Sequence, residues 1–179
     1  MKRLVYLTAV CFGLFAFNSC EKMSDEYQPF TFNPPGGTTS TFHFKSDGTD
    51  TKDGQARISA SFLAPSDIEG CVFVSLFVST GKMVDENVWL SMYLKEKSLV
   101  PGKEPEIERL DFGYFFSSDS RDYTGTFKGN IRVRKFNSEE LVLRFNRVNF
   151  EVGKGTSRFN GDLVFTRRHE TLEEFVGVM

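Results

Sequence analysis

Apolar and polar residues alternate through most of the chain after residue 40. Stretches in which every second side chain is apolar are separated by short segments rich in Gly, Asp, Ser and Asn. A period of two is typical of strands that are buried on one face. The pattern therefore predicts an all-β protein with strands at residues 40–46, 55–63, 70–79, 87–95, 107–117, 123–136, 140–151 and 157–167.

One strand changes its pattern in the middle. In the stretch ELVLRFNRVNFEV, the apolar positions are odd-numbered up to Phe145 and even-numbered from Val148. One extra residue in the strand accounts for such a change of parity. A β-bulge is therefore predicted near Asn146-Arg147.

Two segments echo each other. FKGNIRV (127–133) and FNGDLVF (159–165) share the pattern Phe-x-Gly-x-apolar-x-apolar. A glycine within a strand permits a bend or a close approach of another backbone. The echo predicts two bent strands in equivalent places rather than a repeating architecture.

The hairpin expected from residues 70–79 and 87–95 has one aliphatic face and one mixed face. Its even-numbered positions are aliphatic or Met and are predicted to face the core. A register that pairs the two serines of the other face would also pair its aromatic side chains, with Cβ atoms about 5 Å apart. This candidate ligand face consists of Phe73, Ser75, Phe77, Trp89, Ser91 and Tyr93.

Aromatic rings on the solvent side of a sheet need a cover. One candidate is the C-terminal segment, in which Leu172, Phe175, Val176 and Met179 have the spacing of an apolar stripe on a short helix. The other is a ligand, because rings beside hydroxyls suit sugars or other flat, partly apolar molecules. Both alternatives stay open at this point.

The N-terminal segment has the pattern of an export signal. Lys2-Arg3 precede an uncharged, mostly apolar run of 14 residues from Leu4 to Phe17, which is shorter than the roughly 20 residues of a bilayer span. Ser19-Cys20 resembles a bacterial lipobox, and FNSCEK is similar to lipoproteins of the Bacteroidetes group. The resemblance implies a signal peptide at 1–19 and acylation of Cys20, which would attach the chain to a membrane; the alternative is an ordinary signal peptide with an incidental Cys.

Residues 20–39 are predicted to form the lipidated cysteine and a flexible tether, because they contain Pro29, Pro34-Pro35 and Gly36-Gly37. Fully extended, such a tether spans at most about 65 Å. The alternation in QPFTFN (28–33) allows a short edge strand within it. EKMSDE loosely resembles the acidic signal for surface display, which implies the outer membrane and leaves open whether the chain faces the periplasm or the cell surface.

Composition narrows the class of partner. Removing residues 1–19 leaves 160 residues and changes the formal charge from −2 to −4. A mildly acidic chain with scattered charges gives no electrostatic reason to bind nucleic acid. Once Cys20 is acylated, Cys71 is alone, so no intrachain disulfide can form; we expect Cys71 to be a buried core residue.

The combination TGTFKGNI, LVLRFNRVNFEV and FNGDLVF resembles the C-terminal half of small Bacteroidetes lipoprotein domains. That resemblance implies an antiparallel β-sandwich or a lipocalin-like barrel. We predict a single all-β domain at 40–168, a sandwich of about eight strands with an up-and-down barrel as the alternative, followed by a tail or short helix at 169–179.

Motifs of catalysis and metal binding are absent from the sequence. It contains no HExxH, GxSxG, Walker or dinucleotide motif. His43 and His169 are predicted to be separate surface residues, and the paired glutamates are attributed to solvated strand ends or a helix face. No catalytic residue, metal ligand or cofactor is assigned.

Three hypotheses follow. The first is a non-enzymatic, membrane-anchored lipoprotein that binds a small ligand, a glycan or a protein through its β-domain. The second is a structural or accessory subunit of an outer-membrane complex without a small-molecule ligand. The third, a β-sandwich hydrolase, would need two carboxyl groups facing each other across a groove.

Overall fold

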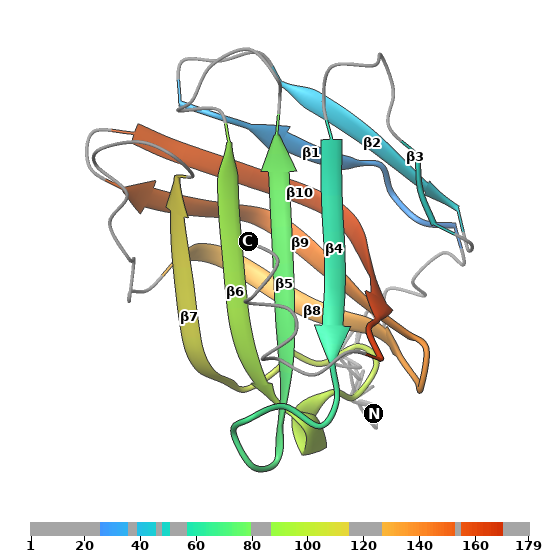
Figure 1. Ribbon diagram of the computed structural model, residues 1–179. Coiled ribbons are helices and arrows are strands. Elements are labelled where there is room, and N and C mark those ends of the chain that lie inside the picture. Colours follow the sequence, from blue (N-terminus) through green and yellow to red (C-terminus); the bar gives the residue numbers. More distant parts are fainter. Residues whose placement is uncertain are drawn as a thin grey trace, which may run out of the picture.

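The computed structural model describes residues 26–35, 39–45, 48–50, 57–79, 87–114, 127–152 and 155–169, with the backbone alone at residues 44, 45, 48–50, 114 and 152. This part of the chain is all-β, which confirms the predicted class (Figure 1). Its helical element is a short 3-10 turn, η2 (Glu96–Ser98). None of the described residues forms a helix long and apolar enough to cross a bilayer.

The strands are β1 (Phe30–Asn33), β2 (Ser40–Lys45), β3 (Gly48–Asp50), β4 (Arg57–Leu63), β5 (Cys71–Ser79), β6 (Val88–Lys95), β7 (Ile107–Tyr114), β8 (Lys128–Phe136), β9 (Glu140–Val152) and β10 (Gly155–Arg167). β2 and β4–β10 lie at the strand positions that the alternating pattern predicts, and β1 lies within QPFTFN (28–33), where the alternation allows a short strand. β3 lies where the sequence predicts a turn. The expected strand residues 115–117 and 123–126 are outside the described part of the chain.

One continuous mixed sheet connects all ten strands. Along one edge, β10 pairs first with β1 and then with β4, and the β10–β4 pairing is parallel, with Thr166 opposite Ser61. The other edge of β10 pairs with β9, which pairs with β8. Figure 1 shows that β4–β7 form one half of the sheet, which faces the half containing β8–β10 and β1–β3.

The single sheet corrects the predicted topology in two respects. The described strands do not divide into the two separate sheets of a sandwich, and β10–β4 is parallel rather than antiparallel. They do not close into a barrel either, because β7 and β8 are edge strands that do not pair with each other. The predicted C-terminal helix lies outside the described residues.

The core lies between the two halves and is rich in phenylalanine. Phe112 of β7 stacks on Phe150 of β9, with ring centroids 4.5 Å apart. Phe62 of β4 meets Phe136 of β8 edge-on at 6.1 Å. Full burial of one such side chain contributes roughly 1.5–3 kcal/mol relative to exposure, so contacts between the halves stabilise the bend of the sheet.

The β-bulge predicted near Asn146-Arg147 is confirmed. At this point the register advances three residues along β9 but two along β10, and the same stretch of β9 is irregular against β8. Gly129 and Gly161, the glycines of the two echoing segments, flank the bulge with φ angles of 98° and 105°. The echo therefore marks equivalent bends on β8 and β10.

Part of the predicted tether, residues 27–33, belongs to the domain. β1 lies between β2 and β10, so it is not an edge strand. Phe30 and Phe32 are completely buried, and the rings of Phe30 and Phe159 stack at 5.8 Å. The domain therefore begins before residue 40. The alternating apolar side chains of this segment are buried in the core, although prolines and glycines flank it.

A buried ion cluster fixes residues 27 and 28 on the outer face of β8–β10. Oδ2 of the fully buried Asp162 accepts hydrogen bonds from the guanidinium groups of Arg134 and Arg144, each at 2.7 Å. The backbone N–H of Gln28 donates to the same oxygen at 2.7 Å, and the Arg134 guanidinium lies 5.3 Å from the ring centroid of Tyr27. Since a buried carboxylate requires such partners in place of water, the cluster attaches this segment to the sheet.

Candidate functional site

The aromatic face predicted from the sequence has the predicted register. Ser75 of β5 is opposite Ser91 of β6. Phe77 is opposite Trp89, and Phe73 is opposite Tyr93. The even-numbered residues of both strands are buried in the core, so the six side chains share the outer face of β4–β7, which we call the aromatic face.

A polar row crosses the aromatic face from β4 to β7. Ser61 is the register partner of Ser75, Ser75 of Ser91, and Ser91 of Asp111. The rows on either side of it contain the aromatic pairs. Cross-strand partners on one face are about 5 Å apart at Cβ, so the structure places hydroxyl and carboxylate groups in a line between rings.

Asp111 ends the polar row as a buried carboxylate. Its Oδ2 accepts a hydrogen bond from Nε of Arg109 at 2.7 Å. The residue is only 6% exposed, and its Oδ1 has no hydrogen-bond partner within the described residues. Because an unsatisfied buried acceptor costs about 1–3 kcal/mol, a ligand hydroxyl or N–H that reached this oxygen would be favoured.

Tyr93 is held at one end of the aromatic face. Its hydroxyl donates a hydrogen bond to Oδ2 of Asp67 at 3.4 Å, and its ring centroid is 5.0 Å from that of Phe73. Burial of the phenol, followed by the hydrogen bond to Asp67, raises the pKa of Tyr93 to about 12. The hydrogen bond and the contact with Phe73 hold the ring in place at a buried end of the aromatic face.

Trp89 packs directly over a glycine. A Cβ added to Gly113 would lie 2.7 Å from Nε1 of Trp89, and Gly113 is the register partner of Trp89 on β7. The indole therefore occupies the space that any other residue at position 113 would need. This contact fixes the position of Trp89 across the β6–β7 pair.

Sequence reasoning missed the contribution of β7 to the aromatic face. Arg109, Asp111 and Gly113 are the odd-numbered residues of the segment that follows the predicted hairpin. If the odd-numbered residues of the next predicted strand are placed on the same face as Ser91, Asp111 lies on that face too. Residues 170–179, the predicted cover, lie outside the described part of the chain, so that prediction remains open.

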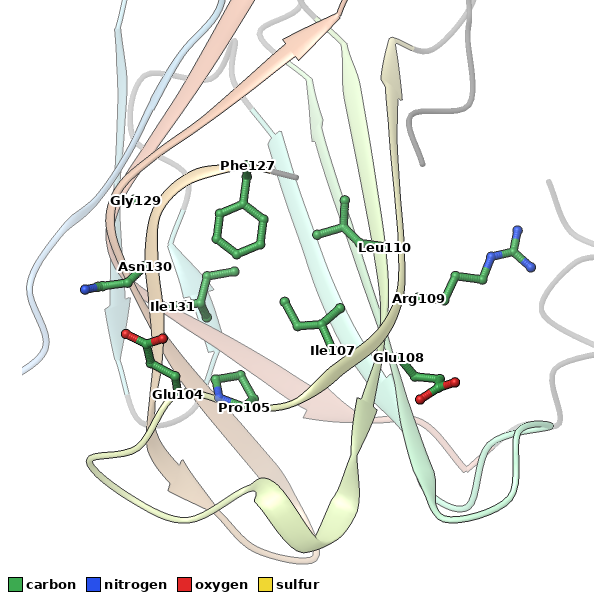
Figure 2. Close-up of a pocket in the computed structure, with 10 residues that line it drawn as sticks. All are labelled: Glu104, Pro105, Ile107, Glu108, Arg109, Leu110, Phe127, Gly129, Asn130 and Ile131. Carbon is green, nitrogen blue, oxygen red and sulfur yellow. The ribbon is translucent and has the colours of Figure 1, made fainter. Parts of the chain in front are cut away.

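A cleft of about 580 Å³ opens between the edge strands β7 and β8. Figure 2 shows Glu108 and Arg109 extending away from it; the third charged residue of its lining is Glu104. Apolar side chains of the two strands and of the residue just before β8 line it: Ile107, Leu110, Phe127 and Ile131.

The chain already pairs with part of the β8 edge at this cleft. The N–H of Val133 donates to the carbonyl of Lys103 at 2.8 Å, and the carbonyl of Val133 accepts from the N–H of Gly102 at 2.7 Å. Ile131 lies two residues earlier on the same strand and directs its backbone groups to the same edge. Within the described residues, Ile131 has no backbone partner on that side.

The other residues singled out from the sequence are scattered. His43 is exposed on β2, and His169 lies 3.9 Å from Glu139 at the surface. Cys71 is a buried free cysteine, as predicted. No group of three metal-ligating side chains occurs among the described residues, and Cys20 is outside them.

The aromatic face and the β7–β8 cleft thus provide different surfaces, one of rings and hydroxyls and the other of aliphatic groups between backbone edges. Comparisons of the chain with protein-family models, with curated proteins and with solved structures found no match.

Proposed function

We propose that this chain is a lipid-anchored, non-enzymatic binding protein of the bacterial cell envelope, and that its aromatic face binds a saccharide. The observation that carries the proposal is the polar row Ser61–Ser75–Ser91–Asp111 between two rows of aromatic rings. Protein sites for small ligands combine apolar surface with a few placed polar groups, and this face has both.

The chemistry of a sugar matches the two components of the face. The C–H side of a pyranose ring is apolar and can lie against Trp89 or the Phe73–Tyr93 pair, whose rings are half-buried or buried. Its hydroxyls can exchange hydrogen bonds with the half-buried Ser75 and Ser91, and Asp111 lies beside Ser91 at the end of the polar row. A glycan larger than one ring could contact both aromatic rows.

The anchor is part of the same proposal. The basic and apolar leader followed by Ser19-Cys20 supports acylation of Cys20 and attachment to the outer membrane. A lipid at the N-terminus would keep the saccharide site at the envelope. Mass spectrometry of the protein purified from membranes tests this part: a diacylglyceryl group on Cys20 supports it, and an unmodified N-terminus contradicts it.

Trp89 is the single tryptophan of the chain, so its fluorescence reports directly on the proposed site. We expect a glycan screen to identify a ligand that changes this fluorescence and binds in calorimetry. Trp89→Ala and Asp111→Asn should each weaken calorimetric binding about tenfold, which corresponds to about 1.4 kcal/mol. Thr41→Ala, on an exposed position of β2, serves as the control.

Two results would contradict saccharide binding at this face. One is a ligand whose affinity is the same for wild type and Trp89→Ala. The other is the absence of binding throughout a broad glycan panel, both for the full chain and for a variant that ends at His169. Binding that appears only in the shortened variant would identify residues 170–179 as the cover.

A second candidate function rests on the β7–β8 cleft. Two strand edges flank it, and the backbone of residues 102 and 103 already pairs with one of them. An apolar extended segment of an envelope protein could add by strand pairing to the part of the β8 edge, at Ile131, that has no backbone partner within the described residues. This arrangement favours an accessory subunit of an outer-membrane complex.

Photo-crosslinking in the producing cells separates this function from saccharide binding. A crosslinking residue in place of Ile107, in the cleft, should give a specific protein adduct, whereas one in place of Thr41 should not. Equal adducts at both positions, or none at Ile107, would remove support for strand addition.

A further inference from the structure

The outer face of the other half of the sheet carries a second polar row. Asn33 of β1 is the register partner of Arg158 of β10, Arg158 of Asn149 of β9, and Asn149 of Lys128 of β8. This row crosses four strands on the opposite side of the core from the aromatic face. It contains amides and cations rather than rings and hydroxyls.

The row lies in a concavity of about 630 Å³. Its lining combines amides and hydroxyls with a few charged groups, and we call it the Arg147–Arg158 concavity. The uncharged polar residues that line it are Thr31, Asn33, Thr39, Asn149, Thr156 and Asn160. Such groups both donate and accept hydrogen bonds, so the concavity suits a ligand with several hydroxyls.

The bulge in β9 turns Arg147 into this concavity. Arg147 has a φ of 49°, which is uncommon for a residue with a side chain. Its backbone N–H donates to Oδ1 of Asn160 at 3.2 Å, and its carbonyl accepts from Nδ2 of Asn149 at 2.9 Å. Bulges often re-aim a side chain, and here the two asparagines hold the turned backbone.

The concavity has an excess of positive charge. Lys128 pairs with Glu151 at 2.9 Å, so those two charges offset each other. Arg147 and Arg158 are exposed and form no ion pair with a described carboxylate. The lining therefore has a formal charge of +2 in a chain whose formal charge is −2.

We propose that the Arg147–Arg158 concavity binds an anionic sugar, that is, a saccharide that bears a carboxylate or a phosphate. A guanidinium group forms two parallel hydrogen bonds with such an anion. The surrounding amides and threonine hydroxyls bind the sugar hydroxyls. This site is separate from the aromatic face and does not depend on the function proposed for it.

Calorimetry with the full chain in detergent tests the proposal. The probes are an oligogalacturonate, which carries carboxylates, a glucose phosphate, the corresponding neutral sugars, and inorganic phosphate. We expect at least one charged sugar to bind about tenfold or more tightly than its neutral counterpart, and to lose about tenfold in affinity in the double variant Arg147→Gln/Arg158→Gln. Added salt should weaken this binding, because exposed charges are screened.

Arg132→Gln is the matched control, because Arg132 is an exposed arginine on β8 that does not line the concavity. It should retain wild-type affinity, and so should Trp89→Ala, which separates this site from the aromatic face. Unfolding curves confirm that each variant folds. The proposal is overturned if no charged sugar binds, if neutral sugars or inorganic phosphate alone bind equally well, or if Arg132→Gln weakens binding as much as the double variant.

Discussion

Single residues decide how closely the chain packs at the bends of the sheet. Gly161 has a φ of 105°, and a Cβ at this position would overlap the carbonyl oxygen of Pro29. Gly102 has a φ of 85°, but a Cβ there would meet no atom within 4 Å. Substituting each of the two glycines therefore distinguishes the energetic cost of a positive φ from the energetic cost of a steric collision.

We predict that Gly161→Ala lowers the free energy of unfolding by about 1–3 kcal/mol more than Gly102→Ala does, because the collision forces β1 away from β10. Chemical denaturation of both variants measures the difference. Equal losses would show that the approach of Pro29 contributes nothing to stability.

Tyr93 makes stability depend on pH in the alkaline range. Burial, together with the hydrogen bond to Asp67, raises its pKa from 10.0 to about 12. The unfolded chain therefore releases this proton at a lower pH than the native chain, and the stabilising contribution is present below pH 10. It is lost as the pH rises toward the native pKa.

The free energy of unfolding of wild type, relative to that of Tyr93→Phe, should accordingly be constant below pH 10 and fall between pH 10 and about 12. Denaturation curves at a series of pH values give this difference. A difference that is independent of pH in this range would contradict a raised pKa.

At the scale of elements, the cluster around Asp162 joins β8, β9 and β10 to the segment that precedes β1. Arg134 and Arg144 have side chains that are 6% and 14% exposed, and both contact the same carboxylate. Removing one member of a buried ion cluster leaves the others without compensation. In the exposed pair Lys128–Glu151, by contrast, water can solvate one charge when the other is removed.

We predict that Asp162→Asn lowers the free energy of unfolding by about 3–5 kcal/mol, since it removes the buried carboxylate charge that both guanidinium groups contact. Glu151→Gln, which breaks an exposed pair, should cost about 0–1 kcal/mol. Proteolysis at residues 26–28 should accelerate only in the first variant. A small loss for Asp162→Asn would mean that hydrogen bonds, not charge, hold the cluster.

For the whole molecule, the sequence predicts local features better than long-range ones. Period-two alternation locates most strands, and the two serines specify the β5–β6 register, because both features lie within one hairpin. The parallel pairing of Thr166 with Ser61 joins positions that are far apart in the chain, and alternation contains no information on which distant strands become neighbours.

The candidate site shows the same limit. The aromatic residues were predicted because one hairpin contains them, whereas Asp111 was missed because it reaches the face from the next strand. No pattern in the sequence predicts that Arg147 and Arg158 lie in one concavity. Their common location depends on the bulge, whose position was predicted but whose effect on side-chain direction was not.

The attachment of Gln28 to Asp162 has a consequence for orientation at the envelope. Glu26 follows Cys20 by six residues, so even a fully extended connection is only about 20 Å long. If Cys20 carries the lipid, Glu26, whose carbonyl accepts a hydrogen bond from Arg134 of β8, stays within about 20 Å of the lipid-bearing residue. The two proposed binding surfaces lie on opposite outer faces of the sheet, so such a short connection would hold them in different surroundings relative to the bilayer.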